Sequence, residues 1–480
     1  MNQLKQQILD LQSKSQPLEP NEAQRNAYLN KVNAYANSFL NSIETTKAFC
    51  GEKETPHVFK ITNKTKPIED ILELYANEVA AKGINAASGG HLGYIPGGGI
   101  YTSSIADYLA DVTNEYVGMH FSCPGGVAIE YELLNWMKSL FSFPESAIGN
   151  LTSGGSIANL IALTAARDKH GIKNAVIEKS VIYMSPQVHH CIQKALRIIG
   201  LEDVQIRYLE LDANSRIVAS DLEEKIKADK KHGLNPFVVI ASAGTTDTGA
   251  IDPLKDIGNI AKANNLWYHI DGAYGGFFIL IDKVKHRFNG IEMADSLVID
   301  PHKGLFLPYG LGAVLVKDKE AVYHSNHYRA NYMQDAIDDA MPVNPADVSP
   351  ELTKHFRSLR MWLPLQLHGI EPFVACLEEK LLLTQYFREE LIKIGFKVGP
   401  DPDLSVSYFW YPTIDGNENA FNEKLLKELH NDGEIFLSST LINGKFVIRM
   451  AILSFRTKLD TIDKAISMIQ RGLSKLNQSV

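Results

Sequence analysis

Cysteine is scarce in this chain. Only four of its 480 residues are Cys, and these are Cys50, Cys123, Cys191 and Cys376. No two of them have the Cys-x-x-Cys spacing of a redox or zinc motif. The pattern gives no sign of a disulfide framework, so we expect a reduced protein of the cytoplasm.

Long apolar runs and long basic runs are also missing. No stretch approaches the roughly 18 consecutive apolar residues of a membrane-spanning helix. The N-terminus, Met-Asn-Gln-Leu-Lys-Gln-Gln-Ile, lacks the apolar core of a secretory signal. The net charge of −8 argues against a nucleic-acid partner. We therefore expect neither a membrane nor a nucleic acid as partner.

The composition is otherwise that of an ordinary globular enzyme, with 45% apolar and 22% charged residues. From residue 91 to 366, short apolar runs alternate with stretches of helical spacing. The runs are 181–184, 237–240, 266–270, 296–299 and 312–316, and the helical stretches include 157–169, 188–199 and 221–230. This alternation predicts an α/β domain with a mainly parallel central sheet.

The two flanks of this domain have different patterns. Residues 1–90 read as helices, and 68–81 has the clearest helical spacing. An arm this apolar must bury one face, either on its own large domain or on a second subunit. Residues 367–480 predict a small α+β domain, with Phe446–Ile452 as its central strand.

Two of the apolar runs end abruptly in polar residues. One ends at Asp271, in Trp-Tyr-His-Ile-Asp-Gly-Ala, and the other precedes Lys303, in Asp-Pro-His-Lys-Gly. Buried parallel strands deliver such side chains to a site beyond their carboxyl ends. A lysine that can form a Schiff base, with a carboxylate for a pyridinium nitrogen, is what pyridoxal phosphate requires. Gly304 is expected to leave room for the ring beside the lysine, and the small Ala273 to let it lie flat.

These two motifs resemble the group II pyridoxal-phosphate-dependent amino-acid decarboxylases, which include the aromatic-amino-acid, glutamate, tyrosine and diaminobutyrate enzymes. The resemblance extends from about residue 91 to about residue 457. It implies a fold-type I enzyme that binds pyridoxal 5'-phosphate on Lys303 and converts an L-amino acid to its amine and carbon dioxide. It also implies a homodimer with active sites formed between the two subunits.

A glycine pair opens the helix that begins near Gly155, in Leu-Thr-Ser-Gly-Gly-Ser-Ile. Free N–H groups and the dipole at such a helix start bind phosphate. No Lys-Ser or Lys-Thr follows, so the motif is not a P-loop, and taken alone it is better read as an ordinary capped helix. The resemblance assigns the cofactor phosphate to Gly155 and Ser156.

The resemblance assigns further cofactor contacts. A histidine at the position of His189 stacks on the pyridine ring, opposite Ala273, and is a catalytic candidate with Lys303 and Asp271. Thr246 lies by the cofactor, with Thr245 as the alternative, and His302 bonds the phosphate or a neighbouring group. Asp300 stands where Asn is often found, and its role is left open. The run His189-His190-Cys191 has no matching ligand pair elsewhere, so no metal is expected.

Substrate residues are expected in His-Leu-Gly-Tyr-Ile-Pro-Gly-Gly-Gly, where Tyr94 and Pro96 fit the family pattern, and at His120. Ile95 stands where an aromatic residue is expected after Tyr94, the residues Gly97–Gly99 are unusually small, and His120 stands where aromatic-specific members tend to carry Trp. These departures put an aromatic substrate in doubt, and a merely flexible glycine turn is the alternative.

The segment 325–349 predicts a loop that closes over the site. Family members carry a loop tyrosine that protonates Cα, but its position falls near Asn344 and Pro345, so Tyr332 or His189 is expected to give the proton. Three alternatives to amine formation remain. They are another fold-type I reaction (carbon–carbon lysis or transamination), decarboxylation coupled to aldehyde formation, and a non-enzymatic pyridoxal-binding protein.

Overall fold

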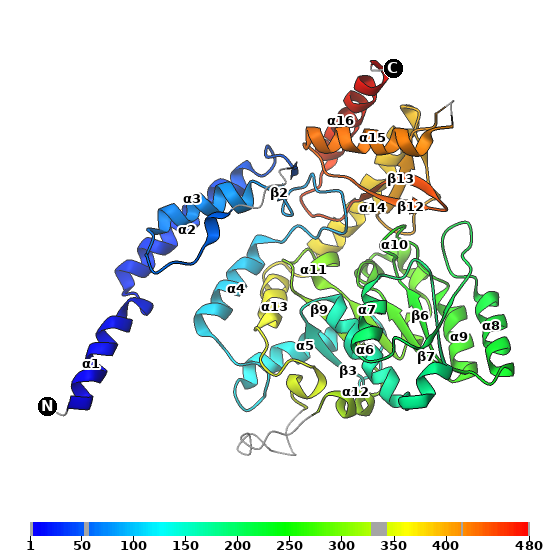
Figure 1. The fold of residues 1–480 in the computed structure, drawn as a ribbon, viewed down its shortest axis with the longest axis horizontal. Helices are drawn as coiled ribbons and strands as arrows, with labels where there is room; N and C mark the ends of the chain where they lie inside the picture. Colours follow the sequence, from blue (N-terminus) through cyan, green and yellow to red (C-terminus); the bar gives the residue numbers. More distant parts are fainter. Residues whose placement is uncertain (1–2, 52–56, 328–342, 414–415, 479–480) are drawn as a thin grey trace.

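A seven-stranded sheet forms the centre of the large domain in the computed structural model, which describes residues 3–51, 57–327, 343–413 and 416–478 (Figure 1). The strand order is β3-β9-β8-β7-β6-β4-β5. In this order the bounds are Ile148–Thr152, Gly312–Val316, Ser296–Ile299, Trp267–Asp271, Asn235–Ser242, Ser180–Met184 and Gln205–Tyr208. Strands β5, β4, β6, β7 and β8 are parallel, whereas β9 is antiparallel to both β3 and β8. The expectation of a mainly parallel sheet is confirmed.

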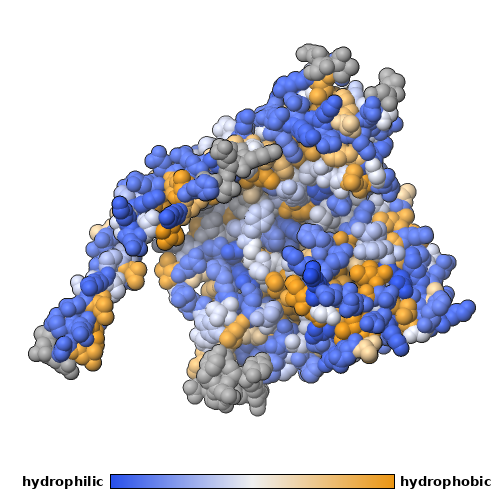
Figure 2. Space-filling view, viewed as in Figure 1, coloured by the Kyte–Doolittle hydropathy of each residue, from blue (hydrophilic) through white to orange (hydrophobic). Residues whose placement is uncertain are grey.

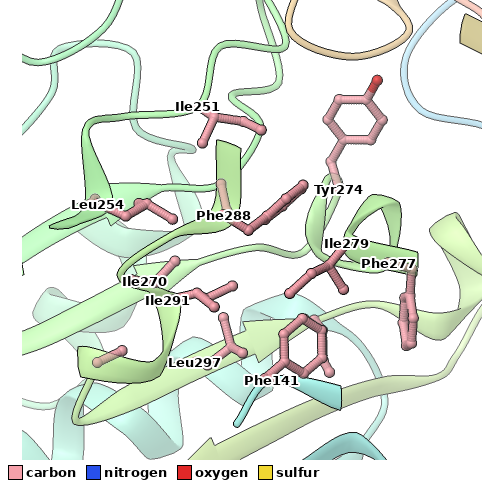
Figure 3. Packing of buried hydrophobic residues seen from close by; sticks show 14 of the residues in the cluster. Phe141, Ile251, Leu254, Ile270, Tyr274, Phe277, Ile279, Phe288, Ile291 and Leu297 are labelled. Atoms are coloured by element: carbon pink, nitrogen blue, oxygen red, sulfur yellow. The ribbon is translucent and has the colours of Figure 1, made fainter. Parts of the chain in front are cut away.

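The middle strands are apolar runs because helices cover the sheet on both faces. The main helices of this domain are α4 (Tyr101–Thr113), α5 (Pro124–Leu140), α6 (Gly155–Lys169), α7 (Cys191–Ile198), α8 (Ala219–Lys231), α9 (Leu254–Asn264), α12 (Lys319–Asn326) and α13 (Arg357–His368), of which α4 packs on α13 rather than on the sheet. Alternate residues of β7 enter different cores. Tyr268 and Ile270 belong to one cluster, and Trp267 belongs to another that includes residues of α6 and α7. Figure 3 shows the first cluster, where Ile270 lies near Ile291 and Leu297.

The predicted strands and helices of this domain are confirmed, each within a few residues of the expected bounds. Strands β3 and β5 were not predicted. The sequence of β3, Ile-Gly-Asn-Leu-Thr, is buried throughout but contains Gly and Asn in place of a continuous apolar run. A short strand can therefore be completely buried and still lack the continuous apolar run from which a strand is predicted.

The C-terminal part has its own antiparallel sheet, of order β10-β11-β13-β12. The strands are β10 (Lys397–Val398), β11 (Val406–Trp410), β12 (Ser438–Ile442) and β13 (Lys445–Ala451), and the helices are α14 (Glu371–Lys393), α15 (Glu418–Asp432) and α16 (Leu459–Gln478). The strand expected at Phe446–Ile452 is β13, and it is interior to this sheet. The domain boundaries at 90 and 366 stay predictions, and α13 runs across the second.

The N-terminal helices form an arm that extends away from the rest of the chain (Figure 1). It consists of α1 (Gln3–Ser15), α2 (Glu22–Ser42) and α3 (Ile68–Tyr75), none of which has a buried residue. Apolar side chains are exposed along it, including Leu4, Ile8, Leu11, Tyr28, Ile71 and Tyr75, and Figure 2 shows orange patches on the arm. The face that was expected to be buried is therefore not buried on its own large domain. None of the described helices has the length and apolarity needed to cross a membrane.

Candidate active site

A cavity of about 250 Å³ lies where β6, β7 and β8 end and α6 begins. All eight residues expected to contact the cofactor line it, namely Gly155, Ser156, His189, Thr246, Asp271, Ala273, His302 and Lys303. They come from five separate segments, and the parallel sheet brings them to one edge. Their individual roles stay predictions, although their convergence follows from the fold.

Lys303 lies in α11 (Pro301–Gly304), the short helix that follows β8. Its Nζ is 3.0 Å from Oδ2 of Asp300. Burial lowers the pKa of Lys303, but the negative charges of Asp300 and Asp271 outweigh it and leave the pKa raised. The amine is thus held as an ammonium by Asp300, and it must lose a proton before it can attack an aldehyde.

Asp271 ends β7 and is only 8% exposed. Its Oδ1 accepts the backbone N–H of Ala273 at 3.0 Å, and its Oδ2 accepts Nδ2 of Asn159 at 3.2 Å. Both oxygens therefore act as acceptors with fixed partners. Such a carboxylate can hold a protonated ring nitrogen in a defined direction.

The start of α6 is built to accept an anion. Gly154 is its N-cap with a φ of 148°, and no side chain caps the helix, so the first N–H groups are free for a ligand. A Cβ at Gly155 would lie 3.0 Å from Oδ2 of Asp300 and 3.3 Å from Cβ of Ala273. The close approach of Asp300 and Ala273 therefore favours glycine at this position, and the role of Gly155 in binding a phosphate stays a prediction.

Asp300, whose role was left open, lies against this helix start. It is 1% exposed, and its Oδ1 has no hydrogen-bond partner among the described residues. Its negative charge is compensated by Lys303 through Oδ2. The same carboxylate therefore faces both the lysine and the place where a phosphate fits.

The two histidines of the cavity are held in different ways. His302 donates from Nδ1 to the carbonyl of Leu311 at 2.5 Å, and its Nε2 lies 3.8 Å from Oδ2 of Asp300. His189 accepts the backbone N–H of Cys191 at its Nδ1, 3.3 Å away. Burial lowers the pKa of both histidines. Both rings are therefore biased towards the neutral form.

Both threonines that were weighed for the cofactor line the cavity. Thr245 shares a hydrogen bond with Thr248 between their Oγ1 atoms at 2.8 Å. The carbonyl of Thr246 accepts from the guanidinium of Arg449, which also donates to the carbonyl of Tyr94 at 3.0 Å. The choice of Thr246 over Thr245 stays a prediction.

The three expected substrate residues do not line this cavity. Tyr94 is 59% exposed and has a left-handed φ of 51°, and Pro96 is buried beside it. The backbone N–H of His120 donates to Oδ1 of Asn344 at 2.8 Å. His120 is thus placed beside Asn344. Tyr332 lies outside the described residues.

The structure gives the glycines at 304, 97 and 98 a packing role that was not expected from the sequence. Gly304 does not line the cavity, and a Cβ there would lie 2.8 Å from Cβ of Phe277, so packing in the core of Figure 3 requires this glycine. A Cβ at Gly97 would lie 2.1 Å from the carbonyl oxygen of His302, and one at Gly98 would lie 2.6 Å from Oγ of Ser454. Gly97 and Gly98 therefore pack tightly against neighbouring segments, and this packing alone requires small residues at both positions. The role of Gly99, whose Cβ would lie no closer than 3.7 Å to Pro308, stays a prediction.

Two buried polar residues next to Asp271, Asn159 and His269, were not predicted from the sequence. Asn159 is hydrogen-bonded to both Asp271 and His269. The side chains of Asn159 and His269 are fully buried. The signal was present in the sequence. His269 precedes Asp271 by two residues, so both side chains emerge on the same face of the strand. Asn159 follows Gly155 by four residues, one helical turn on.

Pyridoxal 5'-phosphate fits the residues present, since the amine of Lys303, the carboxylate of Asp271 and the uncapped start of α6 all face one cavity. Bound there, it would supply an electron sink for a bond at the substrate Cα. Among the described residues no group of three His, Cys, Asp or Glu side chains is arranged to hold a metal ion.

Comparisons with known proteins agree with this arrangement. The family model described as "Pyridoxal-dependent decarboxylase conserved domain" matches residues 53–411. An aromatic-L-amino-acid decarboxylase of Bacillus atrophaeus is 35% identical over 76% of this chain and 77% of its own. Tryptophan decarboxylase 2 of Oryza sativa subsp. japonica is 30% identical over 78% and 79%. The crystal structure of Oryza sativa TDC with PLP and tryptamine superposes with a TM-score of 0.90 at 21% identity, covering 95% of this chain and 99% of that one.

Proposed function

The chain belongs to the pyridoxal-dependent decarboxylase family, and from this premise we propose that Lys303 carries the cofactor and that the substrate is an aromatic L-amino acid. The protein is a pyridoxal-phosphate-dependent carboxy-lyase that acts on an L-amino acid. One observation carries the residue assignment. Among the described residues, Lys303, Asp271 and the uncapped start of α6 face a single cavity whose size suits one small cofactor.

Each residue has a distinct task in this proposal. Gly155 and Ser156 bind the phosphate with backbone N–H groups and a hydroxyl. Asp271 holds the ring nitrogen protonated, and His189 covers the ring opposite Ala273. Asp300 receives the ammonium of Lys303 whenever the substrate amine replaces this lysine, since the two side chains already lie 3.0 Å apart.

The proposal of an aromatic substrate rests on the relatives and on one feature of the fold. The similar proteins include enzymes named for aromatic amino acids, tryptophan and tyrosine. Two of the small residues that argued against such a substrate, Gly97 and Gly98, pack against His302 and Ser454. The unusual residues that remain are Ile95, Gly99 and His120, the last at the position where aromatic-specific members carry Trp.

We also propose that the protein works as a cytoplasmic homodimer. The exposed apolar side chains of α1, α2 and α3 support a second copy as the covering surface. In a dimer Tyr94 and His120, which do not line their own cavity, can contribute to the cavity of the partner. The absence of paired cysteines among the described residues is consistent with a reducing compartment.

The test is product analysis with a panel of substrates. The reconstituted protein is incubated separately with tryptophan, tyrosine, phenylalanine, histidine, glutamate and diaminobutyrate, and carbon dioxide and amine are measured. We expect amine from the aromatic substrates, and none from Lys303→Met. Lys317→Met is the matched control, because Lys317 also follows a strand and its Nζ donates to the carbonyl of Glu292, outside the cavity. Amine from glutamate or diaminobutyrate alone would contradict the aromatic assignment.

Aldehyde formation is the second candidate function. A phenylacetaldehyde synthase of Arabidopsis thaliana is 30% identical over 78% of this chain, and no tyrosine stands at Asn344 or Pro345. Aldehyde and hydrogen peroxide are therefore measured beside the amine, for the wild type and for Tyr332→Phe. We expect amine as the main product of the wild type. Dominant aldehyde would establish the second candidate instead.

A further inference from the structure

A chain of buried hydrogen bonds lies behind Asp271. His269 and Asp271 emerge on the same face of β7, towards α6, where Asn159 lies one turn after the helix start. Asn159, His269 and Ser296 are each 0% exposed. The links are Trp267 Nε1 to Ser296 Oγ at 2.8 Å, Ser296 Oγ to His269 Nδ1 at 2.8 Å, His269 Nε2 to Asn159 Oδ1 at 2.7 Å, and Asn159 Nδ2 to Asp271 Oδ2 at 3.2 Å.

The direction of every link follows from the two ends. The carboxylate of Asp271, as an anion, can only accept, so the amide nitrogen of Asn159 donates to it and the amide oxygen of Asn159 faces His269. The imidazole of His269 therefore carries its hydrogen on Nε2, and in the neutral ring Nδ1 accepts from the hydroxyl of Ser296. At the other end the indole N–H of Trp267 can only donate, so the oxygen of Ser296 accepts from it.

The orientation of the Asn159 amide is fixed on all sides. Its second N–H points to Sγ of Cys191 at 3.4 Å. A flipped amide would place its oxygen against the carboxylate of Asp271, which can only accept, and would lose that bond. Burial lowers the pKa of His269 to about 4, although the charge of Asp271 and a hydrogen bond with the backbone of Ser296 act in the opposite sense. The ring is therefore neutral, with one nitrogen that donates and one that accepts, as the directions of these hydrogen bonds require.

We propose that Asn159 is a positioning residue for the cofactor ring, and that the chain from Trp267 through Ser296 and His269 orients its amide to hold Asp271 in place. The inference rests on the proposed assignment of Asp271 to the ring nitrogen. With Oδ1 held by the backbone of Ala273 and Oδ2 held by Asn159, the carboxylate cannot rotate about its Cβ–Cγ bond without losing a hydrogen bond. Its remaining lone pairs stay directed into the cavity.

A purely structural role for Asn159 predicts a different result, and a matched pair of variants separates the two. Asn159→Leu removes both bonds at similar volume. Asn422→Leu is the control, because Asn422 is also 0% exposed and bonds through Oδ1 and Nδ2, but to the backbone of Tyr411 in the small domain. A general penalty for losing a buried amide acts on both variants equally.

The measurements are kcat, KM, the cofactor dissociation constant and the absorbance spectrum at saturating cofactor. For Asn159→Leu we expect kcat to fall by about ten- to a hundredfold at little-changed KM, since a hydrogen bond to a charged acceptor is lost. We also expect a change in the long-wavelength band that reports ring-nitrogen protonation. Asn422→Leu should keep both properties. Equal behaviour of the two variants would overturn the inference.

A second pair keeps the test informative if either Asn variant fails to fold. In His269→Gln the amide can accept from Ser296 and donate to Asn159, so it preserves the direction of the chain, whereas His269→Leu breaks it. We expect the Gln variant to retain kcat within a few fold and the spectrum of the wild type. An equal loss of kcat in His269→Gln and His269→Leu would show that the hydrogen bonds of His269 do not set kcat, and would refute the inference.

One readout needs neither cofactor nor turnover. In protein labelled with ¹⁵N-histidine, the signals that vanish in His269→Gln belong to His269. We expect them to show the Nε2–H tautomer in the cofactor-free wild type, and the Nδ1–H tautomer there would contradict the inference. Because this spectrum is independent of the reaction, an inactive wild type with the Nε2–H tautomer would count against the proposed function and leave the hydrogen-bond chain standing.

Discussion

Replacing Asp300 by Asn should make Lys303 react faster with the cofactor at neutral pH. The pKa of Lys303 is raised because the charges of Asp300 and Asp271 outweigh the effect of burial. A lysine whose pKa is raised is charged, and unreactive towards an aldehyde, over a wider pH range. Asp300→Asn removes the charge that lies 3.0 Å away, so the pKa of Lys303 should fall and its neutral fraction at pH 7 should rise.

The distance sets the size of the effect. Two unit charges 3.0 Å apart interact by about 5.5 kcal/mol at an effective dielectric constant near 20. Solvent and the new amide retain part of this stabilisation of the ammonium. If only about a quarter is lost, roughly 1.4 kcal/mol, the neutral fraction still rises about tenfold. We therefore expect covalent capture at pH 7 to be at least about tenfold faster in Asp300→Asn.

The assay mixes cofactor-free protein with pyridoxal phosphate across a range of pH and traps the covalent product by borohydride reduction. Because Asp300 also lies against the proposed phosphate position, its removal can speed capture by relieving repulsion. Pyridoxal without phosphate is the control, since it senses only the change at Lys303. The wild-type and Asp300→Asn rates should converge at high pH. Identical pH profiles with pyridoxal would refute the reasoning.

Three further changes have defined outcomes. Asp271→Asn should reduce turnover far more than cofactor occupancy, measured by kcat and by absorbance, whereas an equal loss of both would limit Asp271 to holding the cofactor. Deletion of residues 1–90 should abolish activity and give a monomer or an aggregate in light scattering, and an active, soluble monomer would contradict the dimer proposal. Lys354→Met should cost about 3–5 kcal/mol in urea unfolding, because Nζ of Lys354 pairs with Glu130 at 2.7 Å with side chains 0% and 2% exposed. Lys227→Met, which breaks an exposed pair, is the control and should cost less than about 1 kcal/mol.

Much of the fold could be predicted from the sequence because its central strands are buried on both faces. Such strands read as continuous apolar runs, and β4, β6, β7, β8 and β9 were all found in this way. Strand β3 was missed because its five buried residues include Gly149 and Asn150. The N-terminal arm was predicted as helix from its local spacing. That none of its residues in α1, α2 or α3 is buried against the rest of the chain depends on how the whole chain folds, and no local pattern reports it.

The part of the site that could be predicted is the part that the chain presents at strand and helix ends. Lys303 and Asp271 end apolar runs, and Gly155 opens a helix, so each has a local signal. The bond between Asn159 and His269 joins residues 110 positions apart, and no local pattern reports it. Gly304 was misread because a glycine beside a reactive lysine can serve either the ligand or the core, and only the position of Phe277 decides between them.

Peptide mapping after borohydride reduction tests most directly whether Lys303 carries the cofactor. The protein is reconstituted with pyridoxal phosphate, reduced, digested and analysed by mass spectrometry. We expect one modified peptide, with the pyridoxyl group on Lys303 of Asp-Pro-His-Lys-Gly, and no covalent cofactor in Lys303→Ala. Stoichiometric modification of any other lysine, with Lys303 unmodified, would contradict this expectation.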